Sequence, residues 1–535
     1  MPVIRLSGFQ GENRAVDPKL LSETVGVVSR NQKPAPGDLR PWLQPVTVAT
    51  VPGGRQTIYR FGRDVASDSL FWLSWPSVVH AVRGFDALDT TERTYYTGDG
   101  APKVTSNTMA LASAPFPTAH RPLGLPAPTT APVSVANAGT WTGPLETYFY
   151  LYTYVNDWGW ESAPSPPGLM LTRPTDATVT VSGFVNPPAG NHGVNRIRLY
   201  RTQSGATATE FFFLLELALG TVTTQDDNRM LGEVLPTATW LPPPSDLSHM
   251  TALWNGMLAG ISGGAVRFCE PFVPYAWPIA YDVLPPDSRP VALGVFGQSL
   301  LVLTTGRPLL VTGSSPDSMD QQLLEIPQAC IAPRSVASMG SGVAWASEDG
   351  LCWFGSGNAK VLTAGLISRE NWQAMNPASM IGSMAEGLYF GSYLDGAVRR
   401  GFVIDPLNPN GIYFMDTGYT ALHFDDLQDQ LYVLAGGDIQ RWNEGAPMTY
   451  RFRSKEFRLP RPLNFAAAEV VASGYPVTVR VFADGVLRHT QAVANQNPFR
   501  LPSGFMGHVW QIEIEGVHNV QRVTLATSMA ELADE

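Results

Sequence analysis

The chain has 535 residues with 44% hydrophobic residues, which is too long for one ordinary domain and enough to bury more than one core. Its 50 Gly, 45 Pro and only 15% charged residues describe a turn-rich chain, which excludes a long helical bundle or coiled coil. The net charge of -10 argues against a broadly basic nucleic-acid binder, and the aromatic content of 10% argues against disorder.

Cysteine usage and hydropathy limit the compartment in which the chain folds. The cysteines Cys269, Cys330 and Cys352 are too few for a disulfide framework and too far apart for zinc-binding pairs. Met1 to Leu6 lacks the layout of a signal peptide, and no run of apolar residues is long enough to span a membrane. We therefore expect folding in a reducing cytoplasm.

The first third of the chain divides into three predicted segments. Residues 1–45 contain prolines that disfavour a helix, and we interpret them as an N-terminal arm lying on other surfaces. Residues 46–111 alternate β-branched or aromatic runs with Gly and Asp turns, which predicts short strands and a first propeller blade. Residues 112–132 contain six prolines and form an extended linker.

Residues 133–242 carry long aromatic strands, and about six short strands in about 100 residues is the strand density of a β-sandwich. We expect an inserted fibronectin- or immunoglobulin-like sandwich that folds on its own between Pro-rich borders. Four tyrosines alternate along one predicted strand, and they are Tyr148, Tyr150, Tyr152 and Tyr154. Tyrosine gives a large contact area at low entropic cost, so this face is the candidate partner-contact site. The alternative is a sandwich core with one exposed aromatic face.

Residues 249–444 repeat a turn followed by an apolar strand five times. The five turns stand at Gly256, Gly297, Gly342, Gly387 and Asp429. They are roughly 40–45 residues apart, and a second turn follows each strand, which is the pattern of β-propeller blades. One blade cannot cover both of its faces, so blades must stack on one another. With one blade from residues 46–111 we expect six blades, or seven; stacked Greek-key sheets are the alternative.

Residues 450–535 predict a last β module. The runs Val477 to Phe482 and Trp510 to Glu515 alternate apolar with polar residues, as half-buried strands do. Ala483-Asp484-Gly485 has the composition of a hairpin turn. A short helix is expected at Ser528 to Leu532.

The motifs that carry chemistry in other proteins have structural explanations here. Gly260 to Gly264 matches the G-x-S-x-G nucleophile elbow, but it falls on a predicted hairpin, whereas the motif needs a strand before it and a helix after it. The eight histidines have no spacing for a local metal pair, which leaves only a site composed of distant residues. Asp425, Asp426 and Asp429 lack the glycine and final glutamate of a calcium loop, so we interpret them as a polar turn.

Paired carboxylates and basic clusters also have structural explanations. Propellers host glycoside hydrolysis, which needs two carboxylates, but Asp226-Asp227 and Glu348-Asp349 are adjacent pairs at predicted turns. The cluster Arg451 to Lys455 fits either a phosphate contact or a subunit contact. We therefore expect a protein without enzymatic activity, with no catalytic, cofactor-binding or metal-binding residues.

An ordered series of short segments resembles a family of virion structural proteins of tailed phages and prophages. The segments are Leu39 to Trp42, Thr57 to Phe61, Glu92 to Gly100, Tyr152 to Val155, Glu161 to Pro166, Tyr200 to Thr202, Ala276 to Pro278, Arg453 to Phe457, Pro498 to Gly504 and Ala526 to Leu532. In architecture the chain is similar to the tail nozzle, or packaged-DNA stabilisation, proteins of short-tailed phages. The resemblance covers nearly the whole chain and concerns a structural family, so it carries over no catalytic residues.

The resemblance implies a β-propeller subunit of a ring or tube, hexameric in that family, below the head-to-tail adaptor. Its partners would be further copies, the adaptor and tail fibre or spike proteins, with the host outer membrane as another contact. Genomic DNA would pass through without sequence-specific binding, and an acidic lumen would keep it from sticking. The protein would be made in the host cytoplasm and end in the virion. The alternatives are a receptor- or glycan-binding propeller at the tail tip and a propeller glycan hydrolase.

Overall fold

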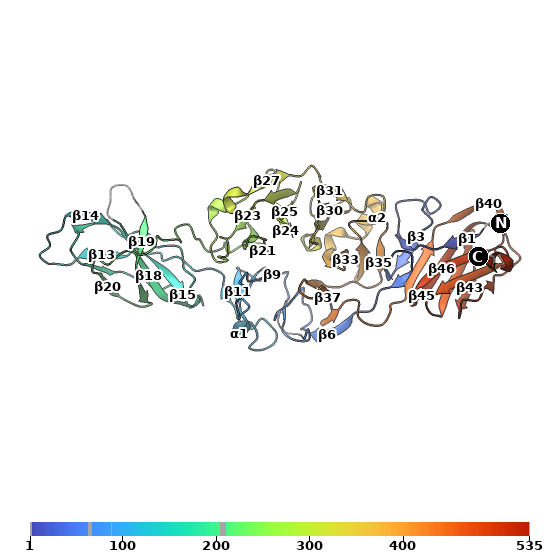
Figure 1. Cartoon of the computed structure of the whole chain (residues 1–535), viewed down its shortest axis with the longest axis horizontal. Coiled ribbons are helices and arrows are strands. Elements are labelled where there is room, and N and C mark those ends of the chain that lie inside the picture. The colour runs from blue at the N-terminus through green and yellow to red at the C-terminus, as the bar shows by residue number, and fades with distance from the viewer. Residues whose placement is uncertain (1–2, 63–66, 87, 204–209, 534–535) are drawn as a thin grey trace. The chain divides into compact units, whose positions relative to one another are not determined.

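The computed structural model describes residues 3–62, 67–86, 88–203 and 210–533 and is all-β, as predicted (Figure 1). The helices among these residues are short: α1 (Asn107–Ala110), α2 (Arg369–Ala374) and α3 (Met529–Ala533). The chain forms two compact units. The first unit comprises Met1–Ser77, Gly294–Val311 and Gln321–Glu535, and the second comprises Val78–Leu293 and Thr312–Asp320.

Small antiparallel sheets of consecutive strands make up much of the first unit. One sheet has the order β28-β29-β30-β31 (Ala337–Ser338, Val343–Ala346, Leu351–Gly355, Asn358–Val361). The next four strands pair in the order β32-β33-β34-β35 (Ile381–Ala385, Leu388–Asp395, Val398–Ile404, Tyr413–Met415). The three strands after them pair in the order β36-β37-β38 (Ala421–Asp425, Gln430–Ala435, Asp438–Arg441). A pair β7-β8 (Thr57–Arg60, Trp72–Trp75) follows, and β28, β32, β36 and β7 lie side by side in that order.

The five predicted repeats are confirmed as strand-turn-strand units. Each predicted run is the second strand of its sheet, and the third strand follows the second turn. Those second strands are β22 (Leu258–Ser262), β25 (Ser299–Thr304), β29, β33 and β37. The turn residues Gly387 (φ 74°) and Asp429 (φ 50°) have left-handed backbone conformations. Glycine adopts this conformation without cost and aspartate tolerates it, which explains why the repeat starts at these residue types.

The N-terminal segment completes the last of these sheets. Strand β6 (Val46–Thr50) pairs antiparallel with β38, so that it becomes the fourth strand of a sheet whose other strands lie almost 400 residues later. Just before it, Trp42 is fully buried with its ring centroid 5.6 Å from that of Trp442. Residues 46–111 are therefore not one blade: β6 and β7-β8 belong to the first unit, and the strands from β9 onward belong to the second.

The C-terminal module contains the strands predicted for it. Strand β42 (Val477–Ala483) turns at Asp484 and Gly485 into β43 (Val486–Val493), and β42 also pairs with β45 (Gly507–Gly516). The remaining strands are β39 (Tyr450–Ser454), β40 (Phe457–Leu463), β41 (Ala467–Ala472), β44 (Phe499–Arg500) and β46 (Val520–Ala526). Their inward side chains belong to one core, in which the ring centroids of Trp510 and Phe465 are 4.9 Å apart.

The interpretation of residues 1–45 as a surface arm is wrong, because their strands are part of these sheets. Strand β1 (Ile4–Leu6) pairs with β46, and β3 (Val25–Arg30) pairs with β39 and with β35. The short strands β2 (Gln10–Glu12), β4 (Gln32–Lys33) and β5 (Arg40–Pro41) pair within the same region. Ile4, Leu6 and Phe9 lie in the core of the C-terminal module, which holds the N-terminus in place by burial.

The second unit contains two further propeller-type sheets and the sandwich. The two sheets are β9-β10-β11-β12 (His80–Arg83, Thr94–Thr97, Lys103–Thr105, Arg121–Pro122) and β21-β22-β23 (Ser248–Ala252, Leu258–Ser262, Ala265–Phe268). Strands β9 and β21 lie side by side. The division between the units falls within the sheet β24-β25-β26-β27 (Pro290–Phe296, Ser299–Thr304, Leu309–Thr312, Asp320–Leu323).

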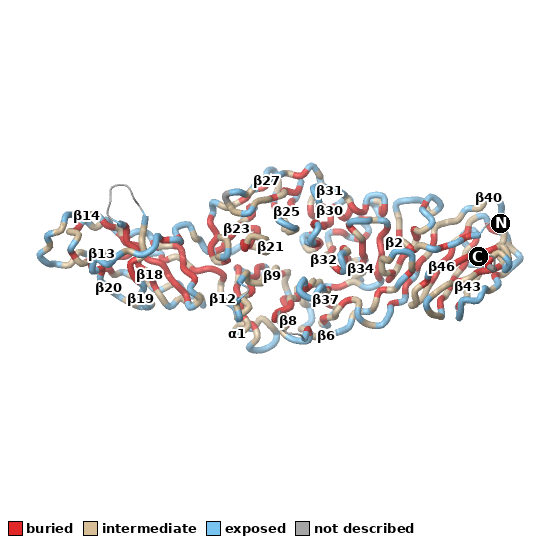
Figure 2. Tube along the Cα trace, in the orientation of Figure 1, coloured by how far each residue is buried: buried red, intermediate tan, exposed pale blue. Residues whose placement is uncertain are grey.

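Residues 133–242 form a sandwich of two layers. One layer consists of β13 (Val133–Ala136), β17 (Val179–Ser182) and β20 (Thr223–Asp226), with the pair β14 (Leu145–Tyr148) and β16 (Leu171–Pro174) beside β13. The other is β15-β18-β19 (Tyr150–Asn156, Val194–Thr202, Phe211–Ala218). Figure 2 shows the buried stretch of β18 inside this part of the chain. The sandwich is not isolated from its unit, because the Trp160 ring stacks on that of Tyr275 at 4.7 Å.

Removal of the Trp42 side chain tests whether the N-terminal segment is packed against the sheet that contains β38. Trp42→Ala would leave a cavity between the N-terminal segment and Trp442, and we expect it to lower the free energy of unfolding by about 3–5 kcal/mol. Leu427→Ala, at a side chain that is 55% exposed, is the control and should change it by less than about 0.5 kcal/mol. Urea unfolding measures both, and equal stabilities would contradict this packing.

Candidate functional site

The prediction that four tyrosines form a partner-contact face is wrong, because all four are buried. Tyr148 is 5% exposed, Tyr150 and Tyr152 are 0% exposed and Tyr154 is 1% exposed. Tyr150, Tyr152 and Tyr154 lie on one face of β15, and this face points at Val179 and Val181 of the opposite layer. Tyr148 belongs to β14, in that opposite layer, and points into the same core. Burial raises the pKa of Tyr150 and Tyr154, so both phenols stay neutral. The tyrosines are the sandwich core.

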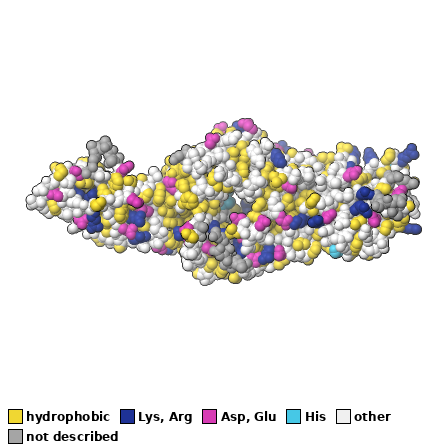
Figure 3. Space-filling view, viewed as in Figure 1, with side chains coloured by type: hydrophobic (Ala, Val, Ile, Leu, Met, Phe, Trp, Pro, Cys, Tyr) yellow, Lys and Arg dark blue, Asp and Glu magenta, His cyan; other side chains and the backbone are white. Residues whose placement is uncertain are grey.

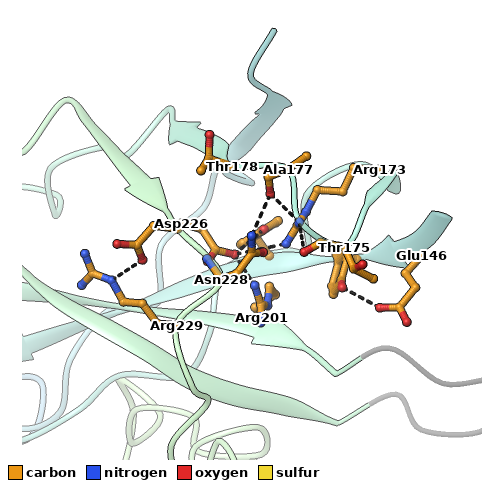
Figure 4. A network of polar contacts seen from close by, with 12 residues as sticks. Glu146, Arg173, Thr175, Ala177, Thr178, Arg201, Asp226, Asn228 and Arg229 are labelled. Carbon is orange, nitrogen blue, oxygen red and sulfur yellow. Dashed lines mark hydrogen bonds and ion pairs between the residues drawn. The ribbon is translucent and has the colours of Figure 1, made fainter. Parts of the chain in front are cut away.

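The phenol group of Tyr150 is paired with a buried ionic cluster around Asp226. Tyr150 Oη donates to Asp226 Oδ2 at 2.8 Å, and Arg201 also donates to this oxygen. Arg173 Nη2 lies 3.8 Å from the same oxygen, while its Nη1 donates to the carbonyl oxygen of Ala177. Figure 4 shows Asp226, Arg173 and Arg201, which come from β20, β16 and β18. The cluster ties the two layers together.

This cluster also corrects the interpretation of Asp226-Asp227 as a pair of turn residues. Asp226 is the last residue of β20 and is fully buried, whereas the Asp227 side chain is 55% exposed and pairs with Arg229 at 2.7 Å. Two carboxylates on opposite sides of a strand end cannot act on one glycosidic bond. Their roles are structural, one in the core and one at the surface.

The outer side of the sheet β15-β18-β19 carries ion pairs. Arg196 and Arg198 from β18 bind Glu216 of β19 at 3.0 and 2.9 Å, and Arg198 also binds Glu161 at 2.7 Å. Burial acts to raise the pKa of Glu216, but the hydrogen bonds from Arg198 and Arg196 outweigh it and lower that pKa. This side of the sandwich is charged and its charges are paired.

The outer side of the other layer is uncharged. Burial alternates along all five strands, and paired registers place the same ten residues outward. They are Val133, Val135, Leu145, Thr147, Thr172, Pro174, Thr180, Ser182, Thr223 and Gln225. We call these ten residues the neutral face. None is ionisable, although the sandwich carries several charges on its opposite side.

Apolar side chains are exposed on the neutral face and at one end of it. Val133, Val135 and Leu145 are 55%, 57% and 69% exposed. Beside them, Leu169 is 89% and Met170 64% exposed. A Cβ on Gly168 would lie 2.6 Å from the carbonyl oxygen of Pro132, which places these two residues close to the start of β13. On the side of the sandwich that Figure 3 shows, at the left of the view, hydrophobic side chains are exposed together with charged ones. Exposed apolar patches of this kind mark interaction sites.

The first unit has a cleft of about 760 Å³ between the C-terminal module and the last sheets. Its charged lining residues are Arg30, Asp416, Arg451 and Glu515, so both signs of charge are present. Asn31 donates to Asp416 Oδ2 at 2.9 Å and thereby fixes that carboxylate. Arg451, predicted as part of a basic cluster, lies here beside acidic groups, so the lining of the cleft is of mixed charge.

The other residues considered for chemistry are engaged in structural contacts. Ser262 lies at the end of β22 before a hairpin, as predicted, and its Oγ donates to Asp246 Oδ1 at 2.6 Å. Asp425 Oδ2 accepts from Arg60 at 2.6 Å, and Asp349 pairs with Arg369 at 3.1 Å. Within the described parts of the chain, no group of three His, Cys, Asp or Glu side chains is arranged to hold a metal ion.

The three cysteines are buried and unpaired with one another. Burial raises the pKa of Cys269, Cys330 and Cys352 to about 12, so their thiols stay protonated and unreactive. Over the residues that the structure describes, no helix is long and apolar enough to cross a membrane.

No family model and no curated protein matches this chain. Among solved structures, it is similar to an exo-β-1,3-galactanase from Phanerochaete chrysosporium (9% identity, 65% of this chain and 93% of that chain, TM-score 0.24). It is also similar to AztD from Citrobacter koseri (12%, 70% and 99%, TM-score 0.24) and to the Neurospora crassa Pan2 WD40 domain (10%, 52% and 86%, TM-score 0.24). At these TM-scores, no activity or detailed fold is transferred.

Asp226 and its neighbour offer a matched test of the buried cluster. Asp226→Asn would leave Arg173 and Arg201 with an uncompensated charge in the core, so we expect a loss of about 3–5 kcal/mol in the free energy of unfolding. Asp227→Asn removes an exposed ion pair that is screened by solvent, so it should change the free energy of unfolding far less than Asp226→Asn does. Chemical denaturation followed by tryptophan fluorescence measures both. Similar effects of the two changes would contradict the conclusion that Asp226 is a buried structural residue and Asp227 an exposed one.

The charged side of the sandwich predicts a pH dependence. Since the pKa of Glu216 is lowered in the folded state, its contribution to stability is present above its ordinary value of 4.5 and is lost as the pH falls through the lowered pKa. Glu216→Gln should therefore melt at a lower temperature than the unchanged chain at pH 7, and the difference should shrink in acid. A difference in melting temperature between the two proteins that stays constant from pH 7 into acid would contradict the ion pairs of Glu216.

Proposed function

We propose that this protein is a structural subunit of a phage tail, a nozzle-like component that builds a ring or tube below the head-to-tail adaptor. The proposal rests on the ordered series of segments that resemble virion proteins. The structural observation that supports it is the neutral face, an uncharged contact surface on a chain with a net charge of -10. The residues considered for catalysis are held in structural pairs, which favours an assembly role over an enzymatic one.

The proposed architecture is a propeller of seven blades with a fibronectin-like insert. Seven successive small sheets follow the chain, from β7-β8 to the sheet of β36, β37, β38 and β6. Propellers bring the first strands of successive blades together around their axis, and β28, β32, β36 and β7 are neighbours of this kind. Completion of the last sheet by the N-terminal β6 would close such a ring.

A glycan-binding role at the tail tip is the second candidate, and one cavity favours it. A cavity of about 330 Å³ in the sandwich is lined by the rings of Tyr200 and Phe213 and by Glu161, Arg198 and Glu233. Aromatic rings beside carboxylates and a guanidinium suit a sugar with several hydroxyl groups. Binding of the purified chain to a panel of bacterial surface polysaccharides, abolished by Phe213→Ala, would favour this role.

Assembly tests the leading proposal. The chain mixed with its purified adaptor should form a closed ring, six-fold by the family resemblance, which mass photometry and cryo-electron microscopy can count. The isolated chain is expected to associate only weakly. A chain that remains monomeric on its adaptor, or that is missing from purified virions, would overturn the proposal.

Chemical inertness gives an independent prediction. EDTA should leave the melting temperature unchanged, because the described acidic and histidine side chains form no cation site. Ser262→Ala should leave infectivity intact, since this hydroxyl only holds Asp246 at a hairpin. Phage carrying the change are plated on the host and compared with unchanged phage. A melting temperature that falls with chelator, or a loss of plaques, would contradict these expectations.

A further inference from the structure

We propose that the neutral face of the sandwich is the surface on which a second copy of this chain docks. The inference rests on the proposed ring function and deepens it, since it assigns the contact between subunits to particular residues. The face is defined by strand register and burial, and its ten outward residues are Val133, Val135, Leu145, Thr147, Thr172, Pro174, Thr180, Ser182, Thr223 and Gln225.

Charge is the first argument for a second copy. Each copy has a net charge of -10, so two copies repel one another over most approaches. A contact that buries a charge without a partner costs free energy. The neutral face has no charge to desolvate, whereas the opposite side would have to bury Arg196, Arg198 and Glu216. The neutral face is thus the side of the sandwich on which acidic copies can meet.

The side-chain chemistry fits a protein surface rather than nucleic acid. Hydroxyl groups can donate and accept, and Thr147 and Thr172 already pair across strands at 3.2 Å between their oxygens. Exposed Val135 and Leu145 add apolar contact. Nucleic acids are bound largely through Lys and Arg contacts to phosphate, and the face has neither. This side of the sandwich therefore lacks the side chains that bind DNA phosphate.

The neutral face is too small to hold two copies together on its own. Five strands spaced about 4.8 Å apart, with four residues each, span about 24 by 14 Å, or roughly 300 Å². A stable two-chain interface buries roughly 800 Å² on each partner. Docking through this face alone is therefore weak, and it becomes stable where an adaptor holds several copies together.

Site-directed photo-crosslinking tests the docking. Val135→Cys introduces a thiol at the centre of the face, and the native thiols of Cys269, Cys330 and Cys352 are buried and stay protonated. The purified full-length chain is labelled with benzophenone-maleimide and irradiated alone over a range of concentrations and bound to its adaptor. Ala218→Cys is the matched control, because it is exposed on the charged side opposite Arg196.

The expected result is a covalent species of twice 58.0 kDa from the Val135→Cys protein, with a yield that rises with concentration and is highest on the adaptor. Ala218→Cys should give about tenfold less, and adding Thr180→Glu to the Val135→Cys protein should lower the yield about tenfold as well. Equal yields from both positions, or a crosslink to another protein in place of a second copy, would overturn the docking. Rings that form without this crosslink would overturn it and leave the proposed function standing, whereas a lack of rings contradicts the function itself.

Discussion

Every part of this chain depends on how an antiparallel sheet covers its two faces. Side chains alternate along a strand, so a small sheet always has a second face that must be buried or made polar. The successive sheets of each unit bury both faces on one another, which is why strands such as β29 and β30 are buried along their whole length. The sandwich has only two layers and keeps two outer sides. These two outer sides are the surfaces on which the sandwich can contact another molecule.

Local turn chemistry was enough to predict the repeated hairpins. Gly387, Asp429 and Asp484 have left-handed backbone conformations, and such positions restrict the residue type strongly enough to be recognised in one sequence. The alternation in β42 likewise follows its burial residue by residue. The pairing of β6 with β38 and of β1 with β46 left no comparable signal, because backbone hydrogen bonds between strands so far apart in the sequence place little demand on side-chain identity. A surface arm and a buried strand therefore look alike in the sequence.

The four alternating tyrosines show a second limit of prediction from the sequence. Period-two alternation correctly placed Tyr150, Tyr152 and Tyr154 on one face, but it could not show that this face is inward. It also missed that the chain changes layers between Tyr148 and Tyr150. Which face is inward depends on Val179 and Val181 from a distant strand and on Asp226, which pairs with Tyr150 Oη. Threonine, serine and valine at the outward positions looked unremarkable in the sequence. Their significance lies in the absence of charge across five strands, which only the register makes visible.

The two outer sides of the sandwich therefore differ in how well they can contact another protein. On one side the charges are paired with one another, as Arg198 is with Glu216 and Glu161, and a partner gains little by approaching groups that are already satisfied. The other side has no charge, and its exposed apolar atoms lose contact with water on docking. Behind both sides, the Asp226 cluster and the tyrosine hydroxyls fix the layers rigidly, so docking does not require the core to reorganise. A rigid, neutral and small surface gives a contact that is specific and weak. In the proposed ring, such a contact would allow copies to associate firmly only when an adaptor holds several of them together.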